Sequence, residues 1–287
     1  MKRLIHILFI LSLLLLFQSC ADDDIEMAAY EPKVVVEGAI EYGESPVILL
    51  SVSASMTGPK DTLSLLNNVI RNAKVTVSDG KITEILTLQT NRDKLPPYEY
   101  RGSVLKGEVG KTYFLEIDYD KRKVTGETYI PMPVSLEKIW FKRETPQDTT
   151  GYIHIRFKNT SNEYYQVATR VFPGEKVTTP CLYGNVDSRL YSDNETISMQ
   201  INKGPTILPE TSYDTYYSIS SFVLLKFSTI SQDGYRFWTS YQNEVLNTQN
   251  PIFPANTSLI SNIKGGIGVW CGYGTSVYRL NLQDIEE

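Results

Sequence analysis

Histidine is scarce in this chain of 287 residues, which contains only two. His6 lies in an N-terminal hydrophobic run, so His154 is the one imidazole in the rest of the sequence. A Ser-His-Asp or Cys-His triad would have to use His154, yet its alternating context, YIHIRF, predicts a solvent-facing position on a strand. We therefore expect no catalytic residue and no enzyme activity.

Cysteine is also rare, with three residues in the whole chain. Cys181 and Cys271 have no second cysteine or histidine at ligand spacing near them, and no stretch matches the calcium-binding loop. The sequence therefore predicts neither a metal site nor a cofactor. The two thiols can pair as a disulfide in an oxidising compartment, and the sequence leaves this pairing open.

Positive charge is in deficit, because 28 Lys and Arg face 33 Asp and Glu for a formal net charge of −5. No stripe of clustered basic residues is visible in the sequence. Nucleic acids and anionic lipid surfaces both require such clusters. We therefore expect neither of them as a ligand.

A single long hydrophobic run is present, at residues 7 to 17, preceded by Lys2 and Arg3. It is shorter than the roughly 20 apolar residues of a membrane span, and it has the pattern of a secretory signal. The small residue Ser19 precedes Cys20, which resembles the bacterial lipoprotein signal. We expect residues 1–19 to be a signal peptide and Cys20 to become the lipidated N-terminus; an ordinary cleaved secretion signal is the alternative.

The residues after Cys20 are acidic and polar. Asp22 to Asp24 resemble the export tags of surface lipoproteins of the Bacteroidetes, although a plain solvated linker has the same composition. We expect residues 20–32 to form a lipidated tether. Several acyl chains on Cys20 would make the attachment of the protein to the membrane effectively permanent. The expected location is the outer membrane, lipid-anchored and facing the cell surface, with the periplasmic leaflet left open.

Short runs with period-2 alternation fill the first half of the chain and predict β-strands. They cover residues 33–40, 46–55, 73–79, 81–89, 98–105 and 112–120. Asp79-Gly80 predicts a type I′ hairpin turn, and Pro131 and Pro133 predict an edge segment that leaves the sheet. Residues 33–133 are therefore predicted to form an immunoglobulin-like β-sandwich.

The second half repeats this pattern at residues 136–144, 152–159, 164–172, 195–203 and 221–231. Residues 173–194 are predicted to be an irregular excursion. Ser231 is a candidate N-cap for a helix that ends before Asn250. The predicted fold is all-β, with two β-sandwich domains, the second spanning residues 134–287, and one short helix in the C-terminal half.

Tyrosine is abundant, with 19 residues. Exposed phenol rings can contact a sugar, peptide or protein ligand. Tyr213, Tyr216 and Tyr217 are our candidate ligand contacts because loop-like sequence flanks them. Ordinary packing between strands is the alternative interpretation of these tyrosines.

Five glycines crowd residues 262–274, but their spacing matches neither phosphate-binding glycine motif. We expect them to permit bulges and close backbone approach in a strand. Asn262, Gly265, Gly266 and Gly268, followed by Trp270, match an Asn-Ile-x-Gly-Gly-x-Gly pattern. With this pattern and the runs KVVVEGAI, KTYFLEIDYD and YIPMPV, nearly the whole mature chain resembles the Bacteroidetes lipoprotein family catalogued as domain of unknown function 4249.

The resemblance implies no activity, because the family has none established. It does imply a genomic context, since members are commonly encoded beside TonB-dependent transporters of the outer membrane. The expected function is that of a non-enzymatic accessory or ligand-capture partner of such a transporter barrel. A surface adhesin or structural lipoprotein that binds host or matrix ligands is the alternative.

Overall fold

A computed structural model describes residues 31–54, 62–159, 163–205, 214–247 and 259–287. The predicted signal peptide, Cys20 and most of the predicted tether lie outside these residues. Pro32–Glu287 forms one compact unit. None of the helices in the described part of the chain is both long enough and apolar enough to cross a membrane.

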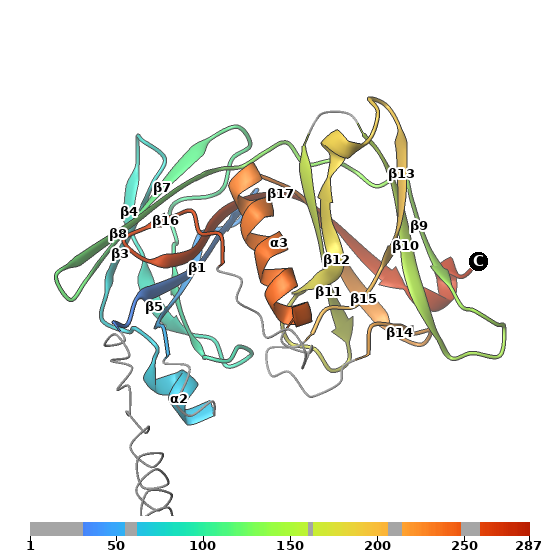
Figure 1. Ribbon diagram of the computed structural model, residues 1–287, viewed down its shortest axis with the longest axis horizontal. Helices are drawn as coiled ribbons and strands as arrows, with labels where there is room; N and C mark the ends of the chain where they lie inside the picture. The colour runs from blue at the N-terminus through green and yellow to red at the C-terminus, as the bar shows by residue number, and fades with distance from the viewer. Residues whose placement is uncertain (1–30, 55–61, 160–162, 206–213, 248–258) are drawn as a thin grey trace, which may run out of the picture. The chain divides into compact units, whose positions relative to one another are not determined.

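An eight-stranded sheet runs through this unit and takes strands from both halves of the chain (Figure 1). Strand β17 (Ile267–Asn281) joins the halves, because it pairs in parallel with β1 (Val34–Glu41) and antiparallel with β15 (Phe222–Ile230). In spatial order the strands are β12 (Thr179–Asp187), β11 (Tyr164–Phe172), β15 (Phe222–Ile230), β17 (Ile267–Asn281), β1 (Val34–Glu41), β2 (Val47–Val52), β6 (Tyr98–Arg101) and β5 (Thr87–Thr90).

A five-stranded sheet encloses a first hydrophobic core together with β1, β2 and β17. Its order is β16 (Ile263–Lys264), β8 (Arg122–Tyr129), β7 (Thr112–Tyr119), β3 (Lys74–Ser78) and β4 (Thr83–Ile85). Alternation along β7 buries Tyr113, Leu115 and Ile117. Trp270 of β17 is fully buried among them, and its indole N–H donates to the Tyr113 carbonyl at 3.0 Å.

A smaller sheet covers a second core on the inner faces of β11 and β15. It contains β13 (Thr196–Ile201), β10 (Thr150–Lys158) and β14 (Tyr217–Ser218), with β9 (Lys138–Lys142) paired to β10. Ile153, Ile155 and Phe157 alternate inward from β10 and are fully buried. Their rows of apolar side chains produce the sandwich packing that the period-2 pattern predicts.

Helix α3 (Gln232–Asn247) lies across a face of the eight-stranded sheet, as Figure 1 shows. Ser231 is its N-cap, because its hydroxyl accepts from the Gly234 N–H at 3.2 Å, which confirms the prediction. Gly234 permits the helix to approach β17 closely, since a Cβ there would lie 2.6 Å from Cys271 Sγ. The short helix α2 (Thr62–Asn67) and the 3₁₀ turns Ser188–Leu190 and Leu282–Ile285 were not predicted.

The predicted all-β sandwich architecture is confirmed, with two local corrections. Residues 173–194 are not irregular throughout, because β12 (Thr179–Asp187) lies there and pairs with β11. The run 81–89 is split into β4 and β5, which belong to different sheets. The domain boundary near Pro133 stays a prediction, and Ile263 and Trp270 from the second half belong to the first core.

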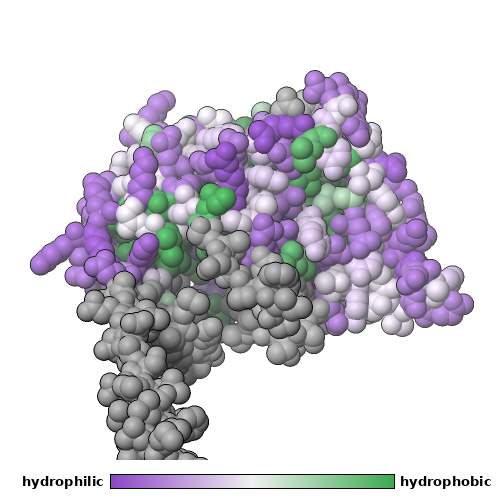
Figure 2. Space-filling model, viewed as in Figure 1, coloured by the Kyte–Doolittle hydropathy of each residue, from purple (hydrophilic) through white to green (hydrophobic). Residues whose placement is uncertain are grey.

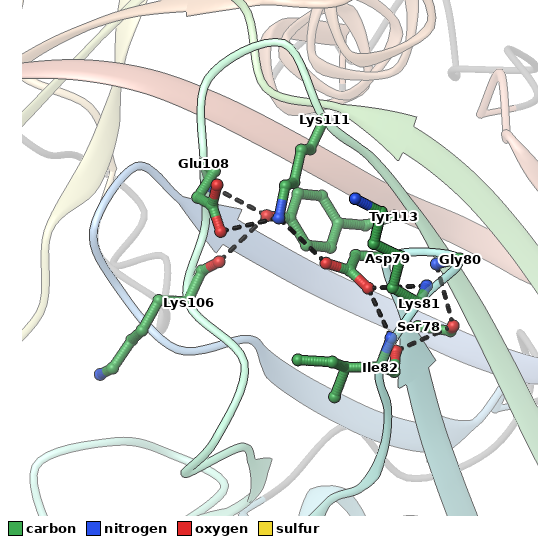
Figure 3. A network of polar contacts seen from close by, with 9 residues as sticks. All are labelled: Ser78, Asp79, Gly80, Lys81, Ile82, Lys106, Glu108, Lys111 and Tyr113. Carbon is green, nitrogen blue, oxygen red and sulfur yellow. Dashed lines mark hydrogen bonds and ion pairs between the residues drawn. The ribbon is translucent and has the colours of Figure 1, made fainter.

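The hairpin at Asp79-Gly80 forms, but not through a two-residue type I′ turn. Ser78 pairs with Thr83, so four residues make the loop, and among residues 79–82 only Gly80 has a positive φ, of 85°. The Asp79 carboxylate stabilises the loop by accepting backbone N–H bonds from Lys81 at 3.0 Å and Ile82 at 2.8 Å (Figure 3).

This carboxylate also holds the hairpin to the neighbouring loop. Lys111 Nζ lies 3.1 Å from Asp79 and 2.8 Å from Glu108 (Figure 3). The backbone N–H bonds, followed by the Lys111 contact, lower the pKa of Asp79 to about 2. The two carboxylates in turn raise the pKa of Lys111 to about 12.

Candidate functional site

The three tyrosines proposed as ligand contacts have different surroundings. Tyr213 lies outside the described residues, and Tyr216 is 40% exposed. Tyr217 is buried in the second core, with its hydroxyl 3.1 Å from that of Thr169. The prediction for Tyr217 is therefore wrong: β14 pairs with β10, and strand alternation turns this ring inward while Tyr216 stays outside.

The two cysteines are free, so the disulfide that the sequence left open is not formed. Cys181 belongs to the second core, whereas Cys271 lies in a separate cluster under α3. Burial raises the pKa of the Cys181 thiol to about 11 and that of Cys271 to about 12. Both thiols are protonated at neutral pH and act as small apolar groups in the packing.

In the described ranges, no group of three or more His, Cys, Asp and Glu side chains could hold a metal ion. His154 is half-buried on the outer face of β10, stacked on Trp140. Burial, followed by the nearby Lys142 charge, lowers its pKa. Its position on a strand is as predicted.

An open groove of about 1070 Å³ has walls made of described residues. It lies on the outer face of β7 and β8 and reaches the start of β11, the start of α3 and the segment leading into β16. Its lining residues are Thr112, Phe114, Leu115, Glu116, Thr125, Gly126, Glu127, Thr128, Tyr129, Glu163, Tyr164, Ser231, Gln232, Asp233, Ser261, Asn262, Ile263 and Lys264.

Strand register explains the floor of this groove. Phe114 lies opposite Glu127, and Thr112 lies opposite Tyr129. All four point away from the first core, because the alternate residues of β7 point into it. Phe114 is 45% exposed and Tyr129 is 41% exposed. Two solvent-accessible rings thus stand among hydroxyl and carboxylate groups.

The groove has an acidic lining. Glu116, Glu127, Glu163 and Asp233 contribute carboxylates, and Lys264 is the cation among the lining residues. Burial raises the pKa of Glu163, whose carboxylate is more costly to ionise there than in water. Aromatic rings beside carboxylates suit a polar ligand that offers hydroxyl or cationic groups.

The glycine-rich motif builds one wall of the groove. Asn262 closes the turn between β16 and β17, because its amide donates to the Trp270 carbonyl at 2.7 Å and accepts from the Trp270 N–H at 2.9 Å. Gly268 has a φ of 122°, and a Cβ there would lie 1.9 Å from the Val36 carbonyl oxygen. The motif therefore locks β17 against β1, which confirms the expected close backbone approach.

These features define the class of protein: an all-β chain with sandwich packing and an open, acidic, aromatic groove on one sheet. The family model "Domain of unknown function (DUF4249)" matches residues 22–279, so the chain belongs to this family. No curated protein matches the chain.

Sequence reasoning missed the groove residues, although part of the signal was present. The run TYFLEIDYD predicts a strand, and its alternation places Phe114 and Glu116 on the face opposite the core. Glu163 and Asp233 had no such signal. Glu163 immediately precedes β11 and Asp233 lies in α3, and only the tertiary structure brings them to β7.

Proposed function

We propose that this protein is a surface-exposed outer-membrane lipoprotein, anchored through Cys20, that captures a ligand for a TonB-dependent transporter without catalysing a reaction. The N-terminal pattern that ends at Cys20 supports the anchor. The membership in a family of unknown function adds no activity of its own. The transporter partnership remains an inference from resemblance.

The groove is the observation that carries the capture role. Its volume of about 1070 Å³ is slightly above that of typical small-ligand sites, which occupy roughly 300–1,000 Å³. It is open to solvent rather than enclosed, as a site that passes a ligand onward requires. Phe114 and Tyr129 supply contact area, and the flanking carboxylates and hydroxyls supply polar partners.

The anchor is tested by Cys20→Ala in cells. We expect the variant to leave the membrane fraction and to keep the thermal unfolding transition of the mature wild-type chain, because the acidic tether precedes the first strand. A variant that remains in the membrane fraction would contradict anchoring through this cysteine. The matched control is Cys181→Ala, which should stay in the membrane fraction.

The groove is tested by the double variant Phe114→Ala and Tyr129→Ala. Both rings are exposed, so the fold should tolerate their loss. We expect uptake through the partner transporter, measured at limiting substrate, to fall by about tenfold, as for loss of a binding hot spot. Ile85→Ala is the control, because Ile85 is 60% exposed on β4 of the same sheet and does not line the groove. Equal uptake by the two variants would refute capture at this groove.

A further inference from the structure

The outer face of the small sheet gathers basic residues that are dispersed in the sequence. Strand β9 presents Lys138, Trp140 and Lys142, and β10 presents Tyr152, His154, Arg156 and Lys158, because alternate residues of both strands point into the second core. Register places Lys138 beside Arg156, Trp140 beside His154 and Lys142 beside Tyr152. We call these seven residues the basic face.

The basic face is not visible as a cluster in the sequence. The period of two scatters the cations along the chain, and strand pairing then brings them together. In Figure 2 the surface over β9, β10 and β13 is mostly hydrophilic or intermediate in colour. The basic face is a local concentration of positive charge on a protein with a formal net charge of −5.

Ring stacking holds the centre of the basic face in place. The Trp140 and His154 rings lie 5.2 Å apart at an interplanar angle of 15°. Lys138 Nζ is 5.3 Å and Arg156 Cζ is 5.5 Å from the centroid of the Trp140 ring. Such cation–π contacts position the positive charges without neutralising them.

Most of these charges keep their capacity to bind an anion. Lys138 is paired with Glu287. In the described part of the chain, Lys142, Arg156 and Lys158 make no ion pair. Arg156 donates from Nε to Ser198 Oγ at 3.2 Å, which leaves its two terminal amino groups to face a carboxylate side by side.

Strand β13 adds neutral hydrogen-bonding groups to the same surface. Gln200 lies opposite His154, Ser198 opposite Arg156 and Thr196 opposite Lys158, and all three side chains of β13 are exposed. Each of these residues of β10 therefore has a neutral hydrogen-bonding side chain of β13 beside it. This arrangement suits a ligand with both anionic and hydroxyl groups.

A protein or a nucleic acid fits this surface less well. Protein interfaces have an apolar centre depleted in Lys, whereas the centre here is charged, and no residue of the basic face is an exposed large hydrophobic one. Single-stranded nucleic acid binds by stacking bases on free aromatic faces. The Trp140 ring is already engaged by His154 and by two cations.

We propose that the basic face binds an acidic polysaccharide whose sugar units carry carboxylates. Arg156 contacts a carboxylate through its terminal amino groups, Lys142 and Lys158 hold neighbouring carboxylates, and the β13 side chains bind hydroxyls. Residues two apart on a strand are separated by about 6.6 Å, so Arg156 and Lys158 suit successive charges of an extended chain. This site is separate from the groove and does not depend on the proposed transporter partnership.

The test measures binding of the full-length chain to immobilised polygalacturonate, with neutral dextran as the reference surface. We expect binding to polygalacturonate alone, weakened at least tenfold between 50 mM and 500 mM salt. The triple variant Lys142→Gln, Arg156→Gln, Lys158→Gln should reduce affinity at least tenfold at low salt. The control Lys81→Gln, Arg92→Gln, Lys121→Gln removes the same charge from exposed positions elsewhere and should change affinity less than threefold.

Two further readouts locate the site and its chemistry. Trp238 and Trp270 are buried, so the ligand should change the emission of Trp140 alone, and Trp140→Phe should abolish the change while the chain still binds. The affinity of Arg156→Lys should lie between those of wild type and Arg156→Gln. The variant keeps the positive charge but loses the planar guanidinium group that donates two parallel N–H bonds to a carboxylate. Equal loss in both triple variants, or equal affinity for single-stranded DNA, would overturn the proposal.

Discussion

At the scale of single residues, Glu163 is the groove side chain whose environment is most informative. Burial raises its pKa, so its folded-state pKa lies above the unfolded value. Its contribution to stability is therefore fully present below the ordinary pKa of a glutamate and is lost as the pH rises through the folded-state pKa. At neutral pH the ionised side chain therefore opposes folding.

Glu163→Gln should accordingly stabilise the protein at pH 7, by up to about 0.5 kcal/mol at a partly solvated site. The gain should disappear near pH 4, where the wild-type side chain is protonated. Urea unfolding at the two pH values measures both effects. Glu127→Gln, an exposed carboxylate of the same groove, is the control. The prediction compares the stability of Glu163→Gln with that of wild type at each pH. A variant that gains less stability over wild type at pH 7 than at pH 4 would contradict the raised pKa of Glu163.

The effect of the Asp79 carboxylate on stability changes with pH in the opposite direction to that of Glu163. Its pKa is lowered to about 2, so its contribution is present above the ordinary aspartate pKa and is lost as the pH falls through about 2. Asp79→Asn keeps one acceptor oxygen but loses the charge that faces Lys111. We expect a lower thermal unfolding midpoint at pH 7 and no difference near pH 2. A pH-independent difference would show that the loop depends on shape and not on charge.

At the scale of elements, strand β17 is constrained by its close packing against β1 at Gly268. Gly268→Ala would place a Cβ against the Val36 carbonyl in a left-handed region, so β17 and β1 would have to separate. Gly110→Ala is the matched control, because Gly110 has a φ of 79° with nothing within 4 Å of its Cβ. The control should lose about 1–2 kcal/mol through backbone strain alone. We expect a distinctly larger loss for Gly268→Ala in urea unfolding, and equal losses would refute the packing role.

Element type was predictable where a single local pattern dominated. The run 164–172 matches β11 (Tyr164–Phe172), and Ser231 caps α3 as its sequence predicts. Strand β12 was missed because Pro180 and Gly184 interrupt its alternation, and Tyr183 has a positive φ of 56°. Local propensity cannot indicate such a strand, because the pairing with β11 and the bulge in it are tertiary.

The candidate sites were less predictable than the fold. Alternation along a strand predicts which of its residues point away from the core. The outward positions of Phe114 and of the cationic residues of β10 could therefore be predicted from the sequence. The sequence does not say which strands pair. The groove and the basic face both depend on that pairing, and the buried position of Tyr217 does as well.

At the scale of the whole molecule, β17 contributes to both cores. Trp270 is buried in the first core and Leu280 in the second. A fragment of residues 33–133 lacks the parallel partner of β1 and the indole that fills its core. We expect this fragment to show no cooperative unfolding and poor amide dispersion by NMR, whereas the chain from residue 32 onward should unfold in one transition. A well-folded fragment would support independent domains divided near Pro133.

The proposed transporter partnership is tested most directly by the composition of the native complex. The native protein is solubilised from the membrane fraction of its cells in mild detergent, purified through a C-terminal tag and analysed by quantitative mass spectrometry. We predict a transporter barrel in near-equal molar amount, retained in the Phe114→Ala and Tyr129→Ala variant, because the groove binds the ligand and not the barrel. A lipoprotein recovered alone, yet exposed to protease on intact cells, would contradict the transporter partnership and favour an adhesin.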